Sequence, residues 1–99
     1  MIRHISVFTL EDKKELPLLK LLLEETGKKC PLIRQSQIGE NISAPPKEGL
    51  EGPDFGDFVQ IIDFDTLEDA KAYPTSEAHI NLFHNSPKMK KVTVIDFEF

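Results

Sequence analysis

Four segments with strand-like alternation constrain this chain most, because two helical segments separate them in a fixed order. The strand patterns cover residues 2–10, 32–43, 55–65 and 89–99. Apolar residues at helical spacing follow the first strand, and a second helical segment follows the third strand. The predicted order is therefore β-α-β-β-α-β.

Local signals place the ends of the helices. Pro17 is tolerated only near a helix start, so we expect regular helix from about Leu16, with Gly27 as its C-terminal stop. The second helix begins after Thr66, whose hydroxyl can cap it, and is broken by Pro74. Thr75 or Ser76 can then cap a further segment that runs through His84. Residues 44–54 hold three prolines and two glycines and are predicted to be a loop.

This element order in a chain of 99 residues predicts one domain, residues 1–99. The expected fold class is α+β, a ferredoxin-like βαββαβ sandwich with an antiparallel sheet and two helices on one face.

The second face of such a sheet has no helices to cover it. We expect that face to carry apolar side chains that water would not tolerate: Phe8, Phe58, Ile62, Phe64 and Val94. A homodimer whose two sheets face each other would cover them.

Charge and composition exclude several partners. The net charge of −5 argues against a nucleic-acid surface, and no apolar run is long enough to span a membrane. The N-terminus lacks the apolar core of a signal peptide, and the single cysteine, Cys30, permits no internal disulfide. We therefore expect a cytoplasmic protein.

Three stretches of the chain together resemble the stress-responsive A/B barrel domain family, called Dabb. They are IRHISVFTL at residues 2–10, FVQIIDFDTLEDAKAYPTSEAH at residues 58–79 and VTVIDFE at residues 92–98. The resemblance covers nearly the whole chain and is weakest over residues 28–54. It implies a dimeric α/β barrel built from two ferredoxin-like protomers, and it implies little about a substrate.

More distantly, the chain resembles cofactor-free polyketide cyclases of the olivetolic acid cyclase type. That resemblance implies His79 as a general base and Tyr73 as its partner, with the same six-residue spacing, and it matches His4 to a histidine of the first strand. A further pocket histidine of those enzymes falls on Phe58 here. The family's common His-Pro pair before the base is Ser76-Glu77 in this chain.

The residues themselves leave the role of this region open. Histidine has an ordinary pKa of about 6.5, so a partly buried His79 would be neutral and could accept a proton; it could equally be a structural side chain. Tyr73 could orient a substrate carbonyl or pack as a helix-end aromatic residue. The predicted cavity is lined by six residues: His4, Phe8, Phe58, Tyr73, His79 and Phe83.

No cofactor or metal is expected. The chain has no phosphate-binding loop and no dinucleotide fingerprint, and its three histidines lack the short spacing of metal ligands. Three functions stay open: a module that binds a small apolar or aromatic molecule, a cofactor-free enzyme with His79 as base, and an assembly unit with a closed cavity.

Overall fold

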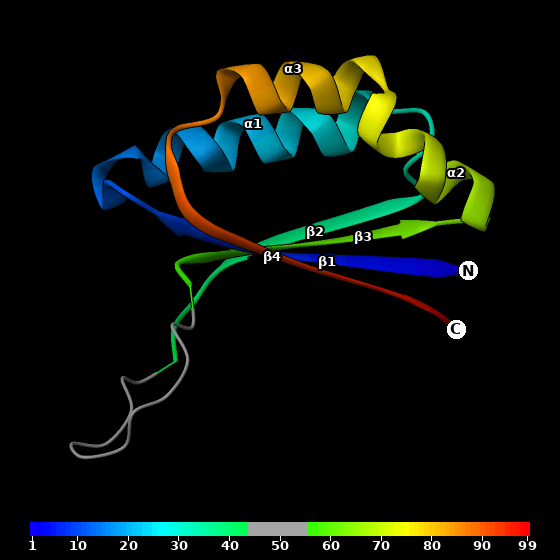
Figure 1. Cartoon of the computed structure of the whole chain (residues 1–99), viewed down its shortest axis with the longest axis horizontal. Coiled ribbons are helices and arrows are strands. Elements are labelled where there is room, and N and C mark those ends of the chain that lie inside the picture. Colours follow the sequence, from blue (N-terminus) through cyan, green and yellow to red (C-terminus); the bar gives the residue numbers. More distant parts are fainter. Residues whose placement is uncertain (44–55) are drawn as a thin grey trace.

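The computed structural model of the chain describes residues 1–43 and 56–99, so the predicted loop at 44–54 lies outside the described residues. The four strands pair antiparallel in the order β2-β3-β1-β4. Helices α1 and α3 lie side by side over one face of the sheet (Figure 1). This arrangement confirms the ferredoxin-like α+β fold. The elements in chain order are β1 (Ile2–Leu10), η1 (Lys13–Glu15), α1 (Leu16–Lys29), β2 (Gln35–Glu40), β3 (Phe58–Phe64), α2 (Leu67–Ala72), η2 (Tyr73–Thr75), α3 (Glu77–Asn85) and β4 (Met89–Glu98).

The predicted caps and the proline break of the second helical segment are present. The Asp69 backbone N–H donates to the Thr66 hydroxyl at 3.1 Å, which starts α2. Pro74 lies in the 3-10 turn η2, and the His79 backbone N–H donates to the Ser76 hydroxyl at 3.3 Å, so Ser76 caps α3. None of the helices within residues 1–43 and 56–99 is long and apolar enough to cross a bilayer.

The predicted helix stop at Gly27 was wrong, since α1 continues to Lys29. A Cβ atom on Gly27 would come within 2.8 Å of the Ser36 hydroxyl oxygen on β2. Glycine at this position therefore lets α1 approach the edge strand β2 closely, although glycine has a low helix propensity.

The prediction of which residues lie on the uncovered sheet face was also wrong. Phe8, Phe58, Ile62 and Phe64 are buried beneath the helices, where they form part of two core clusters. Phe8 and Phe58 pack with leucines of α1, while Ile62 and Phe64 pack with Ile2, Cys30 and Tyr73. Val94 also lies on the helix-facing side, because it pairs with Ser6 in the same row of side chains. Both faces of these strands are apolar, so alternation alone could not tell which face the helices cover.

The uncovered side, called here the open face, consists of the alternate residues of the same strands. It carries Ile5 and Val7 of β1, Val59 and Ile61 of β3, and Thr93, Ile95 and Phe97 of β4. Ile95 is 58% exposed and Phe97 is 42% exposed. An apolar surface therefore does cross the sheet, as the sequence predicts, but it is made of different residues.

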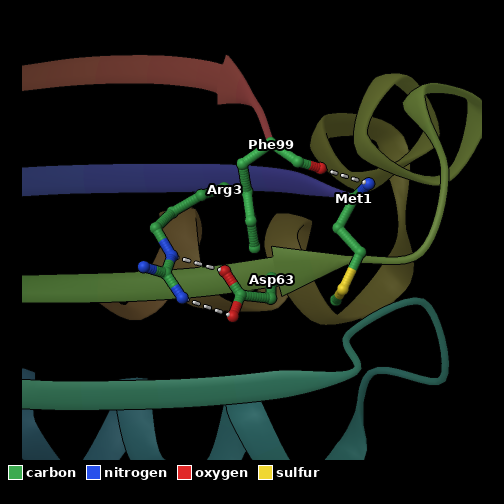
Figure 2. A network of polar contacts seen from close by, with 4 residues as sticks. All are labelled: Met1, Arg3, Asp63 and Phe99. Atoms are coloured by element: carbon green, nitrogen blue, oxygen red, sulfur yellow. Dashed lines mark hydrogen bonds and ion pairs between the residues drawn. The ribbon is translucent and has the colours of Figure 1, made fainter.

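One ion pair closes the end of the open face where the chain termini meet (Figure 2). The Arg3 guanidinium donates to both carboxylate oxygens of Asp63, at 2.8 and 2.9 Å, and Phe99 lies over it with its ring centroid 4.8 Å from the guanidinium carbon. The Met1 amine donates to the Phe99 carbonyl at 3.0 Å. Asp63 is only 5% exposed, and the hydrogen bonds from Arg3 hold the pKa of its carboxyl below the ordinary value.

Asp63→Asn is expected to destabilise the protein at pH 7, and the difference from the wild type should shrink as the pH falls. In the unfolded chain an aspartate titrates at about 3.9, so the ion pair stabilises the fold fully above that pH and loses its effect as the pH falls through the lower folded pKa. Urea unfolding at pH 7 and pH 3 measures both differences. Asp65→Asn is the matched control, because Asp65 pairs with Arg34 at 3.0 Å on the exposed surface. A loss of stability for Asp63→Asn that is equal at the two pH values would contradict the linkage.

Candidate functional site

A hollow of about 460 Å³ lies between the helix-facing side of the sheet and α3. Helix α1 contacts β2 and β3, and α2 contacts β1 and β3, so the edge strand β4 is left uncovered beside them. Val92 and Val94 of β4 are accordingly 46% and 49% exposed although they lie on the helix-facing side. Leu82 and Met89 add to an apolar wall into which a few polar groups project.

Five of the six side chains that the sequence analysis assigned to a cavity line this hollow: His4, Phe8, Tyr73, His79 and Phe83. Phe83 is 74% exposed and lies at the rim. Phe58 does not line the hollow. It is 2% exposed in the core, where it packs with leucines of α1.

Tyr73 brings the two histidines of the hollow together. Its ring lies edge-to-face with the His79 ring, with centroids 4.9 Å apart, and with the His4 ring, with centroids 5.9 Å apart. The Tyr73 ring also packs on the Phe64 ring, with centroids 5.3 Å apart. The turn at Pro74 makes this meeting possible, since Tyr73 and His79 would lie on different faces of an unbroken helix.

His79 is half-buried and hydrogen-bonded at one ring nitrogen. Burial lowers its pKa below the ordinary histidine value, and the neighbouring His4 lowers it further, while a hydrogen bond to the Pro74 backbone acts in the opposite direction. The lowered pKa favours the neutral form of the ring near pH 7. A neutral imidazole that donates through one nitrogen has a bare second nitrogen that can accept a proton.

Tyr73 and Gln60 line the hollow, and each has a buried polar group with no hydrogen-bond partner within the described part of the chain: the Tyr73 hydroxyl and the Gln60 amide nitrogen. Tyr73 is 3% exposed and Gln60 is 2% exposed. Burial raises the pKa of the Tyr73 hydroxyl, which keeps it protonated as a hydrogen-bond donor. An unpaired buried donor costs free energy, so both groups are suited to bind a polar atom of a guest molecule.

Three polar residues of the site were not found by the sequence analysis: Ser6, Gln60 and Asp96. His4 Nδ1 lies 2.6 Å from an Asp96 carboxylate oxygen, and His4 Nε2 lies 2.9 Å from the Ser6 hydroxyl. Ser6 follows His4 on the same face of β1, a spacing that the sequence contains. The pairing of His4 with Asp96 and of Ser6 with Gln60 depends on strand register, which no local pattern gives.

A second hollow of about 540 Å³ adjoins the first on the side of α2. The two share His4, Tyr73, His79 and Val94, and Asp96 lines only the second. The histidine–tyrosine cluster is thus a wall between them. Within residues 1–43 and 56–99, no group of three or more histidine, cysteine or acidic side chains is placed to hold a metal ion.

The stress responsive A/B barrel domain model of the Dabb family matches residues 2–99 of the chain. The search of curated proteins found no match to this chain. The match therefore extends over both hollows and the whole sheet.

Solved structures share the fold at low sequence identity. A dimeric ferredoxin-like protein of unknown function from Thermobifida fusca has a TM-score of 0.76 and 20% identity, covering 99% of this chain and 90% of that one. A Dabb family protein from Mesorhizobium loti has a TM-score of 0.71 and 22% identity, with coverages of 98% and 94%. The hydroxynitrile lyase of Passiflora edulis has a TM-score of 0.75 and 13% identity, with coverages of 97% and 90%. At these identities the likeness establishes the fold and no activity.

Proposed function

The chain belongs to the stress responsive A/B barrel domain family, and on that premise we propose that it is a homodimer in which each protomer binds a small apolar or aromatic molecule in the hollow beside Tyr73. Its single cysteine, Cys30, is buried and fits the reducing, cytoplasmic location that the sequence predicts.

The open face supports the dimer. Its centre is apolar, and Ile95 and Phe97 remain largely exposed in one protomer. The charged side chains at the end where the termini meet, Arg3 and Asp63, already satisfy each other, so a second sheet could cover that end without leaving either charge unpaired. The related structure from Thermobifida fusca is described as dimeric. Two open faces packed together would form the barrel that the family name describes.

Ile95→Lys is expected to convert the dimer to a monomer, because it places a charge within the apolar part of the open face. Light scattering should give twice 11.3 kDa for the wild type and 11.3 kDa for the variant. Ile80→Lys is the matched control: Ile80 is also exposed, at 46%, but lies on α3 away from the open face. A monomeric wild type, or equal dissociation by both substitutions, would refute this interface.

The observation that carries the binding function is an apolar hollow lined by Tyr73 and Gln60, which each hold a buried donor without a partner among the described residues. The volume of about 460 Å³ suits a small organic molecule. The Tyr73 hydroxyl and the Gln60 amide can each donate to an acceptor oxygen of the guest, while Leu82, Val92 and Val94 contact its apolar part. We therefore expect an aromatic or alicyclic ring that bears a carbonyl or phenolic oxygen.

Tyr73→Phe is expected to stabilise the free protein yet weaken ligand binding. The substitution removes a buried unpaired hydroxyl, which favours folding by about 1 kcal/mol, and it also removes a donor to the ligand. Thermal shift with 4-hydroxyacetophenone, and with 4-ethylphenol as a probe that lacks the carbonyl, measures both effects. His84→Gln, an exposed change outside the hollow, should behave as the wild type. A ligand shift that Tyr73→Phe leaves unchanged would contradict this site.

A second candidate function is proton abstraction from carbon by His79. Its support is the neutral, half-buried imidazole, held through the Pro74 backbone at one nitrogen and free to accept at the other. Tyr73, whose ring contacts His79, could donate to the carbonyl next to the acidic carbon. No cofactor is needed for such a step.

Exchange of the methyl protons of 4-hydroxyacetophenone in D₂O tests this base. The wild type should accelerate exchange, and His79→Gln should abolish the acceleration while His84→Gln retains it. The rate should reach its plateau below neutral pH, because the lowered pKa leaves His79 deprotonated there. Equal exchange in the wild type and His79→Gln, followed by proton NMR, would eliminate the enzyme function in this form.

A further inference from the structure

Ser6, His4 and Asp96 form one continuous hydrogen-bonded chain, in which Ser6 and His4 line the hollow and Asp96 lines the adjoining one. The Asp96 carboxylate lies 2.6 Å from His4 Nδ1, and the Ser6 hydroxyl lies 2.9 Å from His4 Nε2. His4 and Ser6 are successive inward residues of β1, and Asp96 is the direct partner of His4 on β4. The two ring nitrogens are thus held at once, one by an acid and the other by a hydroxyl.

These two partners determine which nitrogen of the neutral His4 ring carries the proton. A carboxylate only accepts hydrogen bonds, so the proton lies on Nδ1, and Nε2 is the bare nitrogen. The Ser6 hydroxyl then donates to Nε2. A serine that donates to an imidazole whose other nitrogen is held by a carboxylate has the hydrogen-bonding pattern of an activated nucleophile.

A donor for the developing negative charge lies beside the serine. Gln60 pairs directly with Ser6 across β1 and β3, and both side chains line the hollow. Side chains that face each other in this way have Cβ atoms about 4.5–5.5 Å apart. The Gln60 amide nitrogen is buried and has no partner among the described residues, so the strand residue opposite Ser6 carries an unused hydrogen-bond donor.

We propose that Ser6 is a nucleophile, that His4 is its general base, that Asp96 positions His4, and that the site hydrolyses small esters or thioesters of apolar or aromatic acids. Such a substrate would occupy the hollow of the proposed function, on which this inference rests. Ser6 is 3% exposed, so a carbonyl reaches it only from within the hollow.

The reaction proceeds in two halves, with water as the second substrate. The Ser6 oxygen forms a bond to the acyl carbon as its proton passes to His4 Nε2, and the carbonyl electron pair moves to the oxygen that Gln60 holds. The carbon–oxygen or carbon–sulfur bond then breaks, and the leaving alcohol or thiol takes the proton from His4. Water, deprotonated by His4, attacks the acyl-serine ester and releases the acid, which restores the Ser6 hydroxyl.

The test uses 4-nitrophenyl butyrate with the full chain. The wild type should release 4-nitrophenolate faster than buffer does, and intact-mass spectrometry should find one butyryl group per chain, located at Ser6 by peptide mapping. Ser6→Ala should abolish the adduct, whereas Ser43→Ala, a change at an exposed serine outside the hollow, should keep it. Absence of a butyryl group on Ser6 in the wild type would overturn the proposal.

Asp96→Asn tests the positioning role. Without the Asp96 carboxylate, the proton of His4 is no longer held on Nδ1. Acylation should therefore slow by about 10²-fold or more, with a changed pH profile and little change in KM. Rescue by Asp96→Glu would support positioning. An Asp96→Asn variant with the wild-type rate and pH profile would remove Asp96 from the triad.

Binding and catalysis can fail separately in these samples. The thermal shift with 4-hydroxyacetophenone is recorded on each variant, together with the melting temperature of the free protein. A folded wild type that shows the ligand shift but no acylation overturns the triad and leaves the binding function standing. A wild type with neither a shift nor acylation overturns both.

Discussion

Burial of a four-stranded sheet that is apolar on both faces is the constraint on which the rest of this structure depends. Strand β1 lies between β3 and β4, so its two faces must each find cover. The helices cover one face, where Phe8 packs with the leucines of α1. They leave Ile5 and Val7 on the other face, together with the largely exposed Ile95 of β4. The proposed dimer is the direct consequence, since a second open face has the matching chemistry.

The same incomplete cover produces the site. Because the helices lie over β1, β2 and β3, the inner side of β4 faces a hollow in place of a packed core. Polar side chains on neighbouring strands can then exist at the floor of an apolar space, held by one another or left unpaired. His4 takes both of its partners from this arrangement, while Tyr73 and Gln60 keep donors without partners among the described residues. Binding, proton transfer and acyl transfer are the three functions proposed for this site, and the proposed variants separate them.

Much of the fold could be predicted from the sequence, because the signals that define it are local. The caps at Thr66 and Ser76 and the break at Pro74 each depend on a few neighbouring residues. The wrong predictions have a common cause in contacts between residues far apart along the chain. Glycine is a residue type that often ends a helix, yet Gly27 lies within α1. The close approach of β2 explains why a glycine stands at this position. Phe58 matched a pocket position by counting along the chain, yet in the fold it packs with leucines of α1 in the core.

The sequence by itself determined three features: the order of the elements, the apolar character of both strand faces, and the position of Tyr73 and His79 on either side of a helix break. Each of these depends only on residue type and spacing along the chain. Only the tertiary structure decided which face the helices cover and which side chains meet. Phe8 and Val7 are both apolar and adjacent in sequence. Phe8 is buried under the helices and Val7 lies on the open face, because the helices pack on one side of the sheet. His4 contacts Asp96, 92 residues away along the chain, because the register of β1 and β4 places them opposite each other. That register depends on contacts across the whole sheet.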